Sequence, residues 1–168
     1  LSYIAEKNNV NLEYEASVAG GVPIIRSIKE GLIANKINKI YGILNGTTNY
    51  ILSEMESNNL SFEKALSQAQ ELGFAEPDPT NDIKGFDARY KLVILTYLIT
   101  GHWLSPEQIT LEGIDHLELA DFEYARRMGR EIKLIANLRL FEQGIQVYVL
   151  PLMVNKDEML AKISGSTN

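Results

Sequence analysis

The segment from residue 76 to residue 91 concentrates charged side chains that are able to bind a substrate or move a proton. Its carboxylates and basic groups are Glu76, Asp78, Asp82, Lys84, Asp87, Arg89 and Lys91. Two prolines and a nearby glycine predict a loop over residues 74–84. A long helix is predicted to follow, from about Phe86 to Thr100.

On that helix Asp87 and Lys91 are four positions apart and share one face, which continues as Leu95 and Leu98. Charges at the mouth of an apolar face tend to line a cleft. A desolvated lysine beside carboxylates can hold or deliver a proton at a carbonyl oxygen. Spacing alone still favours a simpler interpretation, in which the two residues form a surface ion pair worth about 0.3–0.5 kcal/mol.

The elements that must position this segment are helices and a short strand. Apolar residues at helical spacing predict a helix from Pro23 to Gly31, with proline at its first position. A dense β-branched and aromatic run over 37–44 predicts a buried strand. The next helix opens at Thr47 and Thr48, and another begins after the N-cap Ser61 and ends at Gly73.

The last third of the chain predicts one more helix and a hairpin. The helix spans about Leu119 to Met128, and strands over 133–141 and 145–154 are joined at 142–144. Strands with covering helices predict the α+β class, with a mixed sheet covered mainly on one face by helices. The hairpin's alternating apolar face suits either ordinary core packing or a sheet surface at a dimer interface.

The totals exclude several classes of function. The chain has 168 residues, a net charge of -6 and no cysteine, so a disulfide scaffold, a thiolate metal site and a cysteine nucleophile are excluded. No basic patch suggests nucleic acid, and the apolar stretch of residues 92–100 is too short to span a bilayer. His102 and His116 lack partners at zinc-ligand spacing, and the glycine pair at 20–21 does not form a dinucleotide fingerprint.

Longer strings carry a resemblance to a known family. LGFAEPDPTNDIKGFDARYKLVIL, residues 72–95, resembles the homoserine dehydrogenase signature LGY-x-E-x-DP-x-x-D-x-x-G-x-D-x-x-x-K. EASVAGGVPII at 15–25 and INKIYGILNGTTNYIL at 37–52 agree with the same family in the same order. The GTTNYIL form is more similar to the monofunctional bacterial enzymes than to those fused to an aspartate kinase.

The resemblance implies a role for particular residues. Lys91 matches the catalytic lysine that gives a proton to the aldehyde oxygen. The substrate-binding positions are matched by Glu76, Asp82, Asp87 and Thr47. A loop that holds a monovalent cation such as sodium in some members, largely through main-chain oxygens, is matched by Glu15, Val18, Gly20 and Val22. A purely structural loop is an equally good interpretation of those four residues.

Three departures from the family pattern leave the charged set intact. Phe74 stands where tyrosine is usual, so any hydroxyl contact from that position is lost. Pro77 replaces a residue that is more often small, and Arg89 and Tyr90 stand where the monofunctional enzymes more often have Ala-His. We therefore expect the activity to be retained, while Phe74 and Pro77 keep open an oxidoreductase for a different amino-aldehyde.

We expect residues 1–168 to form one substrate-binding and catalytic domain, a fragment of a longer cytoplasmic chain that lacks its nucleotide-binding domain. The resemblance implies NAD- or NADP-dependent interconversion of L-aspartate 4-semialdehyde and L-homoserine in threonine and methionine biosynthesis. The isolated fragment is expected to be inactive, and its whole enzyme to be a homodimer. The other alternative is a non-catalytic dimerisation or small-ligand-sensing domain of the same fold.

Overall fold

The computed structural model describes residues 1–167. At the amino end, α1 (Ser2–Lys7) and the 3-10 turn η1 (Glu15–Ser17) precede α2 (Ile24–Arg26), which runs on into a π-helical turn η2 (Ser27–Gly31). The helix predicted from Pro23 to Gly31 is therefore present, with a widened second half. Ile25 and Ile28 are its buried residues.

Four strands form one mixed sheet in the order β1-β3-β4-β2. β3 (Arg130–Phe141) and β4 (Gly144–Asn155) form a long antiparallel hairpin, and β1 (Lys39–Gly42) pairs antiparallel with β3. The short β2 (Thr110–Leu111) pairs parallel with β4. In the β1–β3 register, Tyr41 lies opposite Asn137 and Gly42 lies opposite Ala136.

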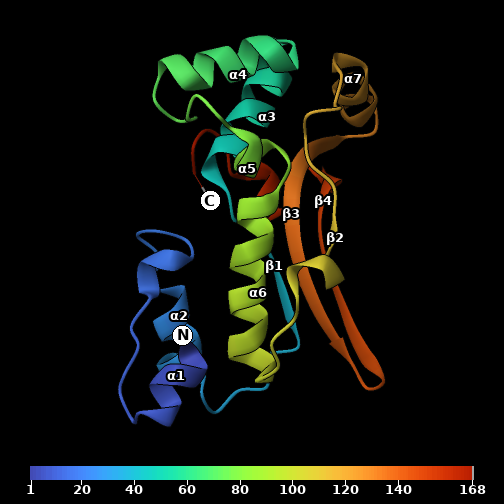
Figure 1. Cartoon of the computed structure of the whole chain (residues 1–168). Helices are drawn as coiled ribbons and strands as arrows, with labels where there is room; N and C mark the ends of the chain where they lie inside the picture. Colours follow the sequence, from blue (N-terminus) through green and yellow to red (C-terminus); the bar gives the residue numbers. More distant parts are fainter. Residues whose placement is uncertain (168) are drawn as a thin grey trace.

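Helices cover one face of this sheet (Figure 1), which confirms the predicted α+β architecture. α6 (Phe86–Thr100) and α3 (Gly46–Asn58) both contact β3, and α4 (Phe62–Glu71) packs on α3. α7 (Leu119–Arg127) contacts β3 near the same end. Alternate residues of β3 face these helices and enter the main core, namely Ile132, Leu134, Ala136 and Leu138.

The opposite face of the sheet is covered only in part. A second small core joins Ile43, Ile135, Val154 and Ala161, the last from the 3-10 turn η4 (Met159–Lys162). Further along this face Tyr148 and Leu150 are only half-buried. Asn137 is buried on the same face, and its side-chain nitrogen has no partner among the described residues.

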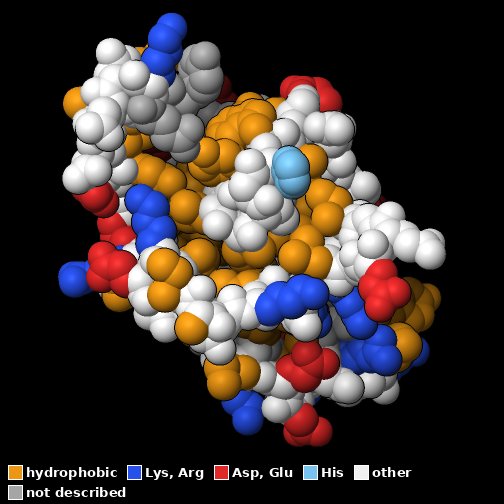
Figure 2. Space-filling view, turned by 90° about the horizontal axis from the view of Figure 1, so that it is seen from below, with side chains coloured by type: hydrophobic (Ala, Val, Ile, Leu, Met, Phe, Trp, Pro, Cys, Tyr) orange, Lys and Arg blue, Asp and Glu red, His pale blue; other side chains and the backbone are white. Residues whose placement is uncertain are grey.

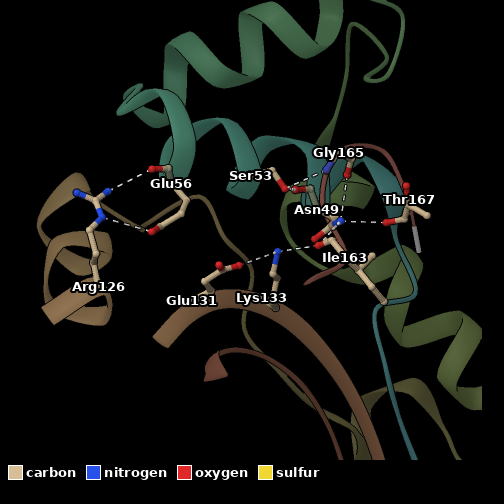
Figure 3. A network of polar contacts seen from close by, with 9 residues as sticks. All are labelled: Asn49, Ser53, Glu56, Arg126, Glu131, Lys133, Ile163, Gly165 and Thr167. Atoms are coloured by element: carbon tan, nitrogen blue, oxygen red, sulfur yellow. Dashed lines mark hydrogen bonds and ion pairs between the residues drawn. The ribbon is translucent and has the colours of Figure 1, made fainter. Parts of the chain in front are cut away.

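Residues after η4 form a strap that is fastened to α3 and β3 (Figure 3). The Asn49 amide donates to the backbone oxygens of Gly165 and Thr167, both at 3.0 Å. The Ser53 hydroxyl accepts from the Gly165 backbone nitrogen at 3.2 Å. Lys133, a buried cation on β3, donates to the Ile163 oxygen at 2.7 Å. The strap thereby ties residues 163–167 to α3, more than 100 positions earlier in the chain, and to β3.

A hollow of about 660 Å³, lined mostly by residues of apolar type, lies between η2 and the carboxyl end of α6. Its apolar lining includes Leu32, Ile37, Leu98 and Ile99, with Lys29 and Lys36 among its residues. Figure 2 views this end of the molecule from below and shows apolar side chains gathered in the depression. The charged residues of the 76–91 segment do not line it.

Several predicted boundaries were wrong in detail. The strand expected over 37–44 is only Lys39–Gly42, because residues 43–45 leave the sheet to enter α3. The segment expected to be a loop over 74–84 contains a one-turn helix, α5 (Thr80–Ile83). Helix α3 begins at Gly46, with Asn45 rather than a threonine as its N-cap. Neither α1 nor β2 was predicted from the sequence.

Candidate functional site

The site is built where three chain segments meet at the amino end of α6. The connection from β1 to α3 brings in Leu44 and Asn45, α5 brings in Asp82, and the first turns of α6 bring in Asp87 and Lys91. Gly85, at φ +78, allows the sharp turn between α5 and α6. A Cβ at that glycine would come 2.9 Å from the Leu111 side chain, so the turn also packs tightly on β2.

Lys91 is held in one orientation by two oxygens. Its ammonium donates to the Asp87 carboxylate at 2.6 Å and to the Leu44 backbone oxygen at 3.0 Å. The side chains of Lys91 and Asp87 are 22% and 32% exposed, so the pair lies in a partly desolvated position. Asp87 and Lys91 are therefore partly buried and joined to the backbone at Leu44, unlike the free surface ion pair that spacing alone suggested.

Asp82 lies beside this pair and carries a perturbed carboxyl group. Burial, the largest influence, raises the pKa of Asp82, and the nearby charges of Asp87 and Glu76 raise it further. The Asn45 hydrogen bond and the Lys91 charge act in the opposite direction, and the net pKa is above the ordinary value. A partly buried carboxyl with a raised pKa beside a lysine and a second carboxylate makes Asp82 a candidate functional residue.

Asn45 joins the two aspartates and was missed by the sequence analysis. Its side-chain nitrogen donates to Asp82 at 2.6 Å and to Asp87 at 2.8 Å, while its oxygen accepts from the Thr48 backbone nitrogen at 2.8 Å. Asparagine is a preferred N-cap residue, so Asn45 before Gly46 was a signal for the helix start. Its bridging role depends on residues 37 and 42 positions away, which no local pattern reveals.

Glu76 and Thr47 lie at the margin of this cluster. The Thr47 hydroxyl donates to the Phe74 backbone oxygen at 2.7 Å and so fixes the loop that carries Glu76. The Gln70 side chain fixes the same loop through the backbone oxygens of Glu76 and Pro77. Glu76 is exposed, and its charge acts on Asp82. Hydrogen bonds thus join Asp82, Asp87 and Lys91 in one cluster through Asn45, whereas Glu76 lies at the edge of this cluster.

The loop expected to bind a cation uses its carboxylate elsewhere. Glu15 accepts hydrogen bonds from the backbone nitrogens of Ile25 and Arg26, both at 2.8 Å, at the beginning of α2. Val18 is fully buried, and Gly20 and Val22 are exposed. Within residues 1–167 no group of three or more acidic, histidine or cysteine side chains is arranged to hold a metal ion. Coordination by main-chain oxygens at Glu15, Val18, Gly20 and Val22 stays a prediction.

Two further features concern cofactors and membranes. The glycines at 20 and 21 follow a 3-10 turn and precede the three-residue α2, so in the described chain they do not join a buried strand to a helix as dinucleotide-binding glycines do. None of the helices described in residues 1–167 has the length and apolarity needed to cross a bilayer.

Comparison with known proteins places this arrangement in a family. The family model described as homoserine dehydrogenase matches residues 23–168. The chain belongs to the homoserine dehydrogenase family. It is 44% identical to homoserine dehydrogenase of Neisseria gonorrhoeae, over 98% of this chain and 38% of that protein. It is also 44% identical to a protein of Pseudomonas canavaninivorans named NAD(+)-dependent homoserine dehydrogenase, over 100% of this chain and 48% of that protein.

Solved structures of the family share the fold. A crystal structure of a homoserine dehydrogenase from Thiobacillus denitrificans superimposes with a TM-score of 0.94 and 42% identity, covering 98% of this chain and 38% of that one. A putative homoserine dehydrogenase from Archaeoglobus fulgidus gives a TM-score of 0.89 and 40% identity, covering 98% and 49%. The chain thus corresponds to less than half of the length of these family members.

Proposed function

We propose that this chain is the substrate-binding and catalytic region of an NAD(P)-dependent homoserine dehydrogenase, which interconverts L-aspartate 4-semialdehyde and L-homoserine. The observation that supports this most directly is the joined cluster of Asp82, Asn45, Asp87 and Lys91 in a family member. The cluster combines a proton donor with carboxylates that suit an amino-acid substrate. The match to the family model, residues 23–168, includes all four of these residues.

In the proposed reaction Lys91 donates the proton to the substrate oxygen and accepts it in the reverse direction. Reduction of the aldehyde adds a hydride to its carbonyl carbon, and the electron pair of the C=O bond moves onto oxygen. That oxygen needs one proton, which the Lys91 ammonium delivers, and the reverse reaction returns it. An ammonium has three N–H groups, and Asp87 and Leu44 accept two of them in the described structure. The third is the one we assign to the substrate oxygen.

The carboxylates would bind the amino group of the substrate. Glu76, Asp82 and Asp87 place three acidic groups around a single lysine, so the pocket has an excess of negative charge that favours an ammonium ion. Asp87 is already engaged by Lys91 and Asn45. Asp82 and Glu76 are therefore the residues we assign to the substrate's α-ammonium group, with Thr47 holding the Glu76 loop in place.

The nicotinamide cofactor supplies the hydride, and the described residues of this chain do not offer a site for it. They lack the strand–glycine turn–helix unit that binds a dinucleotide pyrophosphate. We propose that another part of the same polypeptide binds NAD or NADP, that the isolated chain is inactive, and that the enzyme works in the cytoplasm. The NAD(+)-dependent relative makes NAD the first cofactor to test.

We also propose a homodimer that uses the open part of the outer sheet face. Tyr41, Tyr148, Leu150 and Leu152 are half-buried there around the buried Asn137. The Asn137 side-chain nitrogen lacks a partner among the described residues, and a buried donor normally has one. A second copy lying on this face would bury these tyrosine and leucine side chains and could supply a hydrogen-bond acceptor for the Asn137 side-chain nitrogen.

The decisive experiment is a steady-state assay of the full-length protein. Reduction of NAD and of NADP is followed with L-homoserine as the varied substrate, for wild type, Lys91→Ala and Lys84→Ala. Lys84 is the matched control, since it lies in the same segment and forms an ion pair of the same length, 2.6 Å, with Asp115. We expect Lys91→Ala to lose about 10²-fold or more in kcat and Lys84→Ala to stay close to wild type.

Other outcomes would redirect the proposal. A folded wild type that binds nicotinamide cofactor but ignores homoserine contradicts the substrate assignment. Turnover of another amino-aldehyde would then fit the exposed Phe74, whose ring packs at a tilt against Tyr50, with 4.8 Å between ring centroids. Equal losses for the two lysine variants would contradict the proton-transfer role of Lys91.

A further inference from the structure

We propose that Asn45 is a positioning residue of this site: it binds Asp82 and Asp87 with its two amide hydrogens and so holds the Asp87–Lys91 pair facing the substrate. The proposal rests on the proposed function and adds to it a residue that the family signature at 72–95 does not contain. Three hydrogen bonds of the Asn45 side chain carry the argument.

Both ends of the Asn45 amide are committed. The oxygen accepts from the Thr48 backbone nitrogen at 2.8 Å and caps α3. The nitrogen donates to Asp82 at 2.6 Å and to Asp87 at 2.8 Å, which uses both of its hydrogens. Rotating the amide by 180° would place its oxygen against two carboxylates and its NH₂ group against a backbone N–H. The helix cap therefore fixes which end of the amide faces the site.

The Asn45 amide also gives the two aspartates different roles. The same Asp87 oxygen accepts from Asn45 and from Lys91, so Asp87 is committed to orienting the ammonium. The Lys91 ammonium is held on its other side by the backbone oxygen of Leu44, the residue before Asn45. Asp82 gives one oxygen to Asn45, and no described residue donates to its second oxygen. That second oxygen is the one left for the substrate's ammonium group.

Without the amide, two carboxylates would lie close together in a partly buried pocket with one lysine between them. Like charges in such a position favour protonation of one member. Lys91 would then be shared between the aspartates instead of being held by Asp87 and Leu44. Its alignment with the substrate oxygen depends on that geometry, and small misplacements of a proton donor cost a large part of the rate.

The side chain is 5% exposed, so a test must separate the cap from the bridge. Asn45→Ser keeps an oxygen that can cap α3 but removes both amide donors. Asn45→Asp keeps the shape and the cap, removes the donors and adds a third charge. Ser61→Ala serves as the control for a lost helix cap away from the site. The Ser61 hydroxyl is the N-cap of α4 and accepts a hydrogen bond from the Lys64 backbone nitrogen.

The experiment measures the full-length protein in the homoserine assay across pH, together with thermal unfolding. We expect Asn45→Ser to lose about 10²-fold in kcat/KM while its melting temperature falls no further than that of Ser61→Ala. The acidic limb of its pH profile should move to higher pH, because carboxylates that lose a donor keep their protons longer. The charged groups around the amide are Asp82 and Asp87, which accept from it, Lys91, which donates to Asp87, and Glu76, whose charge acts on Asp82.

A second measurement keeps the test independent of the substrate assignment. Protein labelled with ¹³C at aspartate carboxyl groups is titrated by NMR, with Asp82→Asn and Asp87→Asn used to assign the signals. Asn45→Ser should raise the titration midpoint of the Asp82 carboxyl, because the Asn45 hydrogen bond lowers its pKa, whether or not the enzyme accepts homoserine. An unchanged titration together with an unchanged pH profile would overturn the positioning role and leave Asn45 as a helix cap only.

Discussion

Two asparagines one turn apart at the start of α3 support two different polar networks. Asn45 is 5% exposed and donates to carboxylates, whereas Asn49 is 1% exposed and donates to backbone oxygens of the strap. The bonds of Asn45 are short, at 2.6 and 2.8 Å, and its oxygen is used as well. Those of Asn49 are 3.0, 3.0 and 3.4 Å, and its oxygen lacks a partner among residues 1–167.

The difference distinguishes a functional buried amide from a structural one. Backbone carbonyls do not titrate, so the acceptors of the Asn49 amide carry no charge at any pH. The site network contains Asp82, Asp87 and Lys91, and its energy changes with each proton and each ligand. Residue type and burial are nearly the same in both networks, so the chemistry of the acceptors decides which amide belongs to the site.

The largest effect that tests this comparison is expected at Asn49. Asn49→Ala leaves the strap oxygens of Gly165 and Thr167 without their donor and should lower the free energy of unfolding by about 2–3 kcal/mol. Activity per folded molecule of the full-length protein should stay near wild type, in contrast to Asn45→Ser. Urea unfolding and the homoserine assay measure the two quantities. A loss of kcat without a loss of stability would show that the strap is part of the site.

Gly46 lies between the two networks and should give the next largest effect. A Cβ at Gly46 would come 2.4 Å from the backbone oxygen of Ser166, so the strap or the start of α3 must shift. We expect Gly46→Ala to lower stability by about 2 kcal/mol, as overpacking does. Gly31→Ala is the control, because nothing lies within 4 Å of a Cβ at Gly31 and its φ is ordinary. Equal stability of the two variants would show that the strap adapts freely.

Lys133 tests whether a buried cation matters to the strap network. Lys133 is 2% exposed, donates to the Ile163 oxygen and lies 3.5 Å from Glu131 (Figure 3). Lys133→Met removes the donor but also the cost of burying a charge, so we expect a loss of only about 1 kcal/mol. Asn49 also approaches the Ile163 oxygen, at 3.4 Å. In urea unfolding, the loss of stability of the double variant Lys133→Met with Asn49→Ala should therefore differ from the sum of the two single losses by about 0.5 kcal/mol or more. Strict additivity would show that the two contacts are energetically independent.

The sequence predicted regular elements well because their signals are local. The spacing of apolar residues and the flanking glycines located α6 and its end at Gly101, Ser61 identified the start of α4, and alternation identified the β3–β4 hairpin. The mixed sheet with helices on one face was also confirmed. What could not be predicted was β2, whose two residues are strand only because β4 lies beside them.

The candidate site was predicted in part, and for a comparable reason. Asp87 and Lys91 are four positions apart on one helix, so their spacing predicts their contact. The approach of Asp82 and Asn45 to that pair depends on the turn at Gly85 and on the exit of residues 43–45 from the sheet. Both are tertiary features. The family signature supplied Asp82, whereas Asn45 required the structure.

The smallest effect concerns the ion pair that holds the α5–α6 turn against the following loop. Lys84 donates to Asp115 at 2.6 Å, and this bond, the largest influence, lowers the pKa of the Asp115 carboxyl. A carboxyl with a lowered folded-state pKa stabilises the fold above its unfolded pKa, roughly 4, and the contribution is lost as pH falls through the folded value. Since Lys84 is 49% exposed, solvent screening limits the contribution to about 0.5 kcal/mol.

Asp115→Asn should therefore destabilise the protein at pH 7 and make no difference at a pH below the lowered pKa of Asp115. Asp157→Asn removes the same charge from an exposed turn and should leave stability nearly unchanged at both pH values. Urea unfolding at the two pH values measures the four differences. A deficit for Asp115→Asn that persists in acid would mean that the side chain's packing beside Gly113 matters more than its charge, since a Cβ at Gly113 would lie 3.0 Å from the Asp115 carboxylate.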